Sequence, residues 1–68
     1  MNKYDFVTID ADIMHGVPVF KGTRVPIETL FDYLMTGDSI DEFLDDFPTV
    51  PKPLVEMALE YSKQTLAA

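Results

Sequence analysis

The chain has 68 residues and no cysteine, so it is one domain at most, with a marginal core that no disulfide reinforces. A single histidine and no cysteine exclude thiolate zinc sites and histidine metal clusters, and we expect no metal, no cofactor and no enzymatic activity. The net charge of −7 falls on residues 26–68, whereas residues 1–25 are neutral; an acidic half repels phosphate and favours a basic partner.

The first 25 residues are predicted to form short strands and turns. Residues 7–9 alternate apolar and polar side chains, as a half-buried strand does, and residues 17–20 are a second candidate strand. Gly16 and Gly22 stand where a positive φ is expected. Because two such short strands are marginal alone, their edges are best satisfied by another copy of the chain, and we expect a homodimer.

No apolar run approaches the roughly 20 residues that cross a bilayer. Charged residues also interrupt the N-terminal segment that begins Met1-Asn2-Lys3, so no signal peptide is predicted. We therefore expect a single cytoplasmic domain over residues 1–68 with no membrane contact.

From Pro26 onward the hydrophobic period becomes 3.6, which predicts three helices. The first opens with Pro26 at its first position and ends before Gly37. The second begins with a capping box formed by Ser39 and Glu42, and the third opens with Pro51. The predicted apolar stripes contain Ile27, Leu30, Phe31, Leu34 and Met35; then Ile40, Phe43, Leu44 and Phe47; then Leu54, Met57, Ala58, Tyr61 and Leu66, widened by Val55 and Leu59.

The second and third helices, joined by a predicted turn of three or four residues, have the outline of a helix-turn-helix. In that motif the start of the third helix would enter a DNA major groove. Residues 51–56 offer one cation, Lys52, and no Arg, Asn or Gln to bind a base edge. For the helix-turn-helix outline considered alone, we therefore favour three helices that simply pack together in a core, without a DNA-binding role.

The segment from Lys21 to Arg24 is the one polar cluster of basic sign. Lys21 and Arg24 suit phosphate or carboxylate, and Gly22 lets a partner approach the backbone. The candidate DNA-binding residues are therefore Lys21, Thr23, Arg24 and Lys52. The alternative is that Arg24 forms a salt bridge or hydrogen bond within the fold and orients the turn into the first helix.

The acidic residues of the second helix lack calcium-loop spacing and are expected to form a solvated or partner-facing surface. Asp41 and Asp45 fall on one solvent-facing edge, and Tyr33 falls off the apolar stripe of the first helix. The candidate partner-binding residues are Tyr33, Asp41, Asp45, Glu56 and Glu60.

His15, beside Gly16, suggests a catalytic role at first sight. A general base needs an acid or a nucleophile within reach, and nothing in the sequence places one. A hydrogen bond between His15 and nearby backbone is the favoured interpretation.

Residues 15–26, His-Gly-Val-Pro-Val-Phe-Lys-Gly-Thr-Arg-Val-Pro, resemble the signature of a family of small bacterial and archaeal proteins known as domain of unknown function 433. Residues 37–42, the pair Phe47-Pro48 and residues 58–61 resemble the later motifs of that family. The resemblance thus extends from Ile9 to Tyr61.

The resemblance implies a mainly α, homeodomain-like tri-helical bundle with a helix-turn-helix, preceded by a short β region and commonly dimeric. It also implies the antitoxin of a type II toxin–antitoxin pair, which masks a PIN-like nuclease and usually binds its own operator. We therefore expect an antitoxin that neutralises its toxin through the folded surface and represses its operon as a dimer. A stand-alone DNA-binding regulator is the alternative, and an enzyme using His15 and Arg24 is a third, weaker hypothesis.

Overall fold

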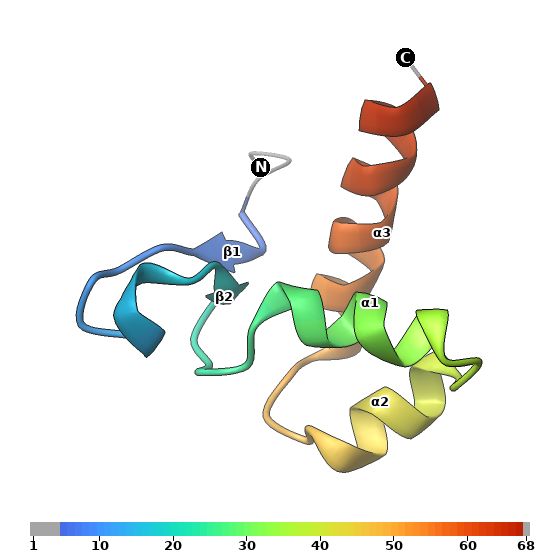
Figure 1. Cartoon of the computed structure of the whole chain (residues 1–68), viewed down its shortest axis with the longest axis horizontal. Coiled ribbons are helices and arrows are strands. Elements are labelled where there is room, and N and C mark those ends of the chain that lie inside the picture. The colour runs from blue at the N-terminus through green and yellow to red at the C-terminus, as the bar shows by residue number, and fades with distance from the viewer. Residues whose placement is uncertain (1–4, 68) are drawn as a thin grey trace.

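The computed structural model describes residues 5–67, in which three helices follow a short β-hairpin (Figure 1). This confirms the prediction of a mainly α fold preceded by a short β region. The N-terminal segment for which no signal peptide is predicted begins with residues 1–4, which lie outside the described residues. In chain order the elements are β1 (Val7–Thr8), the 3-10 turn η1 (Met14–Gly16), β2 (Val19–Phe20), α1 (Ile27–Met35), α2 (Ile40–Asp46) and α3 (Lys52–Ala67).

The hairpin is antiparallel, with Val7 opposite Phe20 and Thr8 opposite Val19. The far side of β2 is bonded as well, because the Phe20 amide donates to the Val25 carbonyl at 2.9 Å and the Ile27 amide donates to the Pro18 carbonyl at 3.0 Å. The segment that enters α1 therefore fastens the hairpin to the helices. The strands are shorter than predicted, since Ile9 follows β1 and residues 17–18 precede β2.

The loop between the strands contains three consecutive residues in the left-handed region, with φ of 50° at Met14, 58° at His15 and 85° at Gly16. Positive φ at Gly16, and at Gly22 with φ of 78°, was predicted. Met14 and His15 were not predicted to be left-handed, and a side chain there costs about 1–2 kcal/mol per residue. Hydrogen bonds from Gly16 N to Ile13 O and from Val17 N to Met14 O close the turn.

Helix α1 begins one residue later than predicted, because Pro26 keeps an extended ψ of 140° and serves as the N-cap. Its C-terminus is a Schellman motif: Gly37 has a φ of 88°, its amide donates to Leu34 O, and the Asp38 amide donates to Tyr33 O. The predicted end before Gly37 is confirmed.

The N-terminus of α2 carries the predicted capping box. The Glu42 amide donates to Ser39 Oγ at 3.1 Å, and the Ser39 amide donates to Glu42 Oε1 at 3.1 Å. The connection from α2 to α3 is residues 47–51, five residues, which is longer than the predicted three or four. Phe47 leaves the helical region, at φ −124° and ψ 70°, and Pro48 and Pro51 follow it, so neither helix extends into the connection.

The core lies where the hairpin meets the helices. Phe20 and Phe43 are fully buried with ring centroids 5.9 Å apart. The buried residues that form one cluster are Phe6, Phe20, Leu30, Phe43, Val50, Val55 and Ala58. Every helix and both sides of the hairpin turn therefore contribute to a single core.

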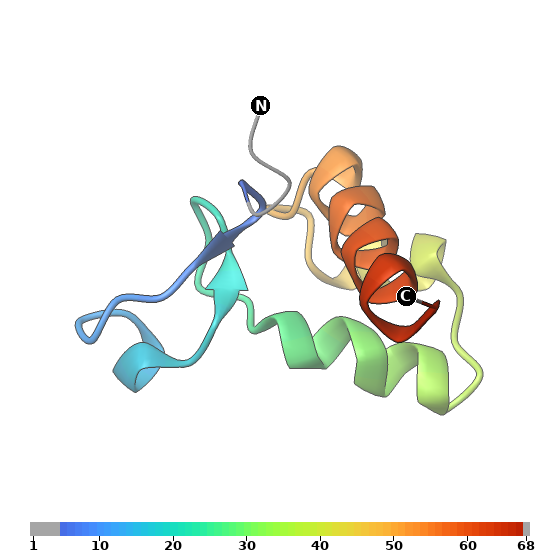
Figure 2. The same cartoon turned by 90° about the horizontal axis from the view of Figure 1, so that it is seen from above.

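Two members of the predicted stripes are exposed rather than buried: Met35 is 84% exposed and Leu66 is 86% exposed. In α3 the buried residues are Val55 and Ala58, while Leu54, Met57 and Tyr61 are only partly buried. The C-terminal turns of α3 rise away from α1 and α2 (Figure 1), which agrees with the exposure of Leu66 near the end of this helix. Figure 2 shows the same helix from above. No helix within residues 5–67 is long and apolar enough to cross a membrane.

Candidate functional site

The negative charge assigned above to residues 26–68 is concentrated in the first part of that range. Residues 26–51 contain seven carboxylates and no Lys or Arg, whereas α3 balances two Lys against two Glu. We call the carboxylates on α1, α2 and the segment between them the acidic surface: Glu28, Asp32, Asp38, Asp41, Glu42, Asp45 and Asp46. This surface accounts for the whole net charge of −7.

Some of these carboxylates hold the fold together and others are available. Glu42 closes the capping box, Asp46 accepts from Tyr33, and Asp38 Oδ2 accepts from the Thr36 hydroxyl at 3.1 Å. Asp41 and Asp45 are exposed, and neither side chain has a hydrogen bond or ion pair within residues 5–67. Four residues apart on α2, they share one face and offer two negative charges that a partner can bind without breaking a contact of the fold.

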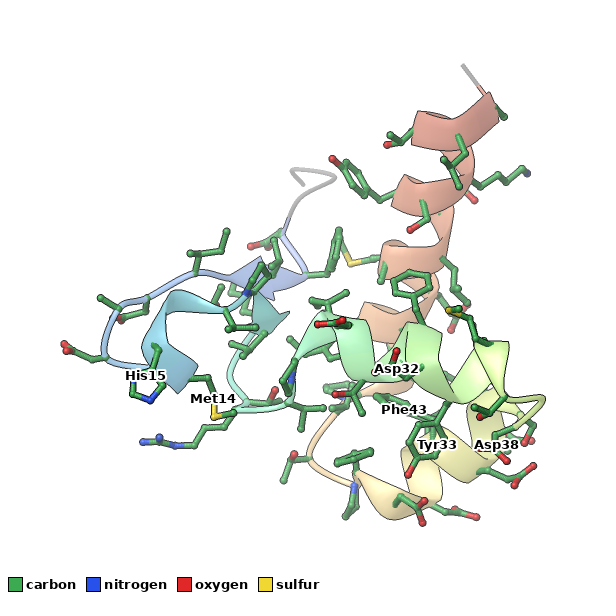
Figure 3. The ribbon with its side chains drawn as sticks, in the orientation of Figure 1. Met14, His15, Asp32, Tyr33, Asp38 and Phe43 are labelled. Carbon is green, nitrogen blue, oxygen red and sulfur yellow. The ribbon has the colours of Figure 1, made fainter. Side chains whose placement is uncertain are left out.

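Tyr33 makes more contacts within the fold than we expected from its position off the apolar stripe of the first helix. Its ring packs edge-on against Phe43 and Phe47, with centroids 5.4 and 5.8 Å away, where α1 meets α2 (Figure 3). Its hydroxyl donates to Asp46 Oδ2 at 2.6 Å. This hydrogen bond, then partial burial and the charges of Asp46, Asp38 and Glu42 raise the pKa of Tyr33 above 10.0. A contact between Tyr33 and a partner stays a prediction.

Glu56 and Glu60 lie exposed on α3, apart in sequence from the acidic surface. Glu60 Oε1 accepts a 3.1 Å hydrogen bond from Gln64 Nε2. Lys52 and Lys63 on the same helix balance the charges of Glu56 and Glu60, so α3 has no net charge. Their role in partner binding also stays a prediction.

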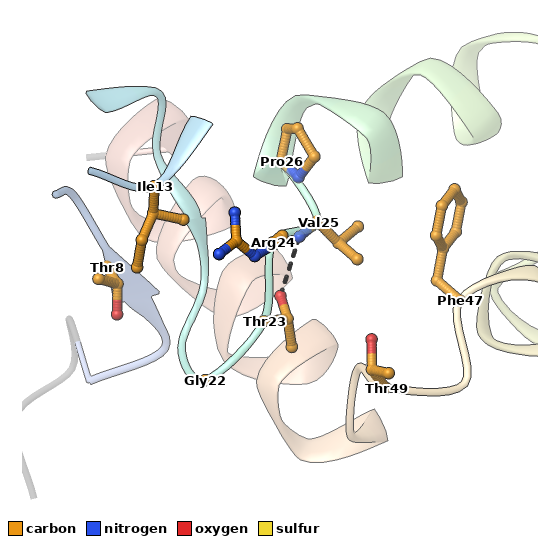
Figure 4. A pocket seen from close by; sticks show the side chains of 9 residues that line it. All are labelled: Thr8, Ile13, Gly22, Thr23, Arg24, Val25, Pro26, Phe47 and Thr49. Carbon is orange, nitrogen blue, oxygen red and sulfur yellow. Dashed lines mark hydrogen bonds between the residues drawn. The ribbon is translucent and has the colours of Figure 1, made fainter. Parts of the chain in front are cut away.

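Within the candidate DNA-binding set, two residues are occupied by the fold. Lys21 Nζ pairs with Asp5 Oδ1 at 2.6 Å. The Thr23 hydroxyl donates to Phe20 O at 2.8 Å and accepts from Val25 N at 3.1 Å, a bond drawn in Figure 4. Sequence reasoning missed this turn-fixing role of Thr23, although a threonine following glycine in a turn is a recognised signal for it.

Arg24 and Lys52 are the members of that set with free charges. Both are exposed and neither forms a hydrogen bond or ion pair in the described part of the chain, so the alternative of an internal Arg24 salt bridge is not what residues 5–67 show. Arg24 borders an open groove of about 620 Å³ between the hairpin and the α2–α3 connection, where Ile13, Phe47 and Thr49 also lie (Figure 4).

His15 lies exposed in the left-handed loop. Its ring makes no hydrogen bond with the residues that the structure describes, so the expected bond to nearby backbone is not found there. Over residues 5–67 no three His, Asp or Glu side chains are grouped to hold a metal ion.

The fold and its surfaces define a small, mainly helical protein with a hairpin beside the helices and a strongly acidic segment over residues 26–51. The chain belongs to the family described as "Protein of unknown function (DUF433)", whose model matches residues 7–62, which confirms the resemblance noted in the sequence. It is similar to "Uncharacterized protein y4eO" of Sinorhizobium fredii, with 30% identity over 59 residues that cover 87% of this chain. The chain spans 27% of the length of that relative. No solved structure matches the chain.

Proposed function

We propose that this protein is the antitoxin of a type II toxin–antitoxin system, acting in the cytoplasm, and that its acidic surface binds and neutralises a PIN-like nuclease toxin. The observation that carries the proposal is the run of seven carboxylates without a cation over residues 26–51. A nuclease has to bind the polyanionic backbone of its substrate, which requires a basic surface. A carboxylate-rich surface on the antitoxin is complementary to such a partner.

The acidic surface is held in place before any partner arrives. The capping box of Ser39 and Glu42 fixes the start of α2, and the hydrogen bond from Tyr33 to Asp46 fixes its end to α1. Since little ordering is needed on binding, more of the electrostatic attraction is retained as affinity. This supports neutralisation by a folded surface.

The test is co-purification of the chain with the product of the adjacent gene, followed by affinity measurements on two matched variants. Asp41→Asn/Asp45→Asn and Glu56→Gln/Glu60→Gln each remove two negative charges with little change in shape. We expect the wild-type chain to bind, the α2 variant to lose about tenfold or more, and the α3 variant to stay within about threefold.

An adjacent gene product that is not a nuclease, or that does not bind, contradicts the antitoxin assignment. If the α3 variant loses as much affinity as the α2 variant, the interface is not confined to the acidic surface. Such a result would mean that Glu56 and Glu60 also belong to the interface.

Repression of the operon is part of the same proposal. With Lys21 paired to Asp5, only Arg24 and Lys52 of the candidate DNA-binding set offer free charge. Phosphate contacts supply most of the affinity for DNA, so we expect operator binding by the complex, to which the basic partner adds charge. An operator shift by the chain alone at low salt, abolished by Arg24→Ala, would favour the stand-alone regulator.

A further inference from the structure

Within residues 5–67 the hairpin has one unpaired edge, on β1. The Lys21 amide donates to Phe6 O at 2.9 Å, so these two residues form a hydrogen-bonded pair. In an antiparallel ladder such pairs alternate with non-bonded ones, so the N–H and C=O of Val7 point away from β2. The Phe20 amide, opposite Val7, likewise points away from the partner strand, and it donates to Val25 O on the far side of β2. Among the described residues β2 thus has a neighbour on each side, and β1 has one.

Exposed apolar side chains lie on the same part of the molecule. Ile9 is 68% exposed and Val17 is 39% exposed. Both border an apolar groove of about 510 Å³, together with Val7, Pro18 and Ile27. Val7 and Ile9 both line this groove, so their side chains lie on the same side of the hairpin. Open strand edges beside apolar side chains favour pairing with another chain.

We propose that this face binds a second copy of the chain, with β1 pairing antiparallel to β1 of that copy about a two-fold axis beside Val7. An edge of this kind is self-complementary under two-fold symmetry, because the Val7 N–H of each copy meets the Val7 C=O of the other. The result is a four-stranded sheet in the order β2–β1–β1–β2, in which Val7 and Ile9 of both copies share one face.

The distribution of charge selects a second copy as the occupant and this face as the site. Residues 26–51 carry the whole net charge, so two copies approaching through α1 and α2 would bring identical anionic surfaces together. Residues 1–25 are balanced, and the groove contains a single charged residue, Glu28. Self-association here also covers apolar surface in a chain too small for a large core of its own. Apart from Glu28, which borders the groove, the carboxylates of the acidic surface lie outside the proposed interface, so this inference does not depend on the proposed function.

The first test uses three lysine substitutions of exposed apolar residues. Ile9→Lys lies on the proposed interface, whereas Met35→Lys and Leu66→Lys, at 84% and 86% exposed positions, lie elsewhere. In sedimentation equilibrium we expect twice the chain mass of 7.7 kDa for the wild type and both controls, and the single mass for Ile9→Lys. A monomeric wild type, a dimeric Ile9→Lys protein or a monomeric control overturns the proposal.

The second test is amide hydrogen exchange, which also shows whether each variant is folded. We expect the Val7 amide of the wild type to exchange at least about tenfold more slowly than in Ile9→Lys, and to be better protected at higher protein concentration. The Phe20 amide, bonded to Val25 O within one chain, should stay protected in both proteins. Rapid exchange at Val7 in the wild type at every concentration overturns the pairing of β1.

Discussion

The Tyr33 hydroxyl donates a 2.6 Å hydrogen bond to Asp46 Oδ2, which ties α1 to the last residue of α2. The negative end of this bond and the neighbouring carboxylates disfavour the tyrosinate. The pKa of Tyr33 is therefore higher in the folded chain than its ordinary value of 10.0.

The first prediction follows from this shift. Because the folded state holds the Tyr33 proton more tightly than the unfolded state, the stabilisation is complete below pH 10.0 and is lost as the pH rises through the folded pKa. We expect Tyr33→Phe to remove this part of the alkaline loss of stability, measured by urea unfolding over a pH series. The difference in tyrosinate absorbance between the two proteins gives the titration of Tyr33, and Asp46→Asn should lower its midpoint. Identical alkaline stability profiles for the wild type and Tyr33→Phe would contradict the assignment.

The second prediction concerns Thr23, whose hydroxyl joins Phe20 O to Val25 N. Thr23→Val keeps the shape of the side chain and removes both hydrogen bonds, so we expect a loss of about 1–2 kcal/mol in the free energy of unfolding. Thr23→Ser should retain most of the stability. Thr49→Val is the matched control, because Thr49 is exposed and borders the same groove without a hydrogen bond to the residues described. An equal loss in both valine variants would argue against a special role for Thr23.

The third prediction concerns the capping box of α2. Ser39→Ala removes the acceptor of the Glu42 amide and should cost about 1 kcal/mol in urea unfolding. Ser62→Ala is the control: its hydroxyl donates to Ala58 O inside α3, a bond that helices do not need. A smaller loss for Ser39→Ala than for Ser62→Ala would show that the cap is not stabilising.

The fourth prediction concerns His15, with its φ of 58°. Glycine adopts this conformation freely, so we expect His15→Gly to increase stability by about 0.5 kcal/mol despite the entropy that glycine adds to the unfolded chain. His15→Ala, which keeps a Cβ, should show no such gain. If the protein is no enzyme, both variants will also retain full biological activity, whereas loss of activity in both would favour the enzymatic hypothesis.

The parts of the fold that are fixed by local chemistry could be predicted from the sequence. Ser39 and Glu42 satisfy backbone groups within one helical turn, and Gly37 can adopt a positive φ that other residues avoid. These signals place the ends of helices to within a residue, as at Pro26. They need no knowledge of the rest of the chain.

Burial depends on neighbours that the period of a helix does not specify. Met35 and Leu66 have the correct spacing for the core, but both are exposed in the structure. In α3 only Val55 and Ala58 are buried, whereas Leu54, Met57, Leu59 and Tyr61 pack against the core while partly exposed. A hydrophobic pattern indicates which side chains share a face, and tertiary structure decides which part of that face is covered.

The candidate surfaces show the same division. The acidic character of residues 26–51 could be predicted from composition, but which carboxylates are already engaged depended on contacts such as that of Tyr33 with Asp46. The ion pair between Lys21 and Asp5 joins residues 16 apart, and no local pattern indicates it. It halves the positive charge that residues 21–24 appeared to offer.

The bonding of β2 on both sides has a consequence for assembly. Because the segment that enters α1 occupies the far side of β2, a sheet built from this hairpin can extend in only one direction. Pairing through β1 uses up that direction in both chains at once, so the structure closes with the first addition. Each chain thereby avoids the open-ended stacking of strands that leads to fibres.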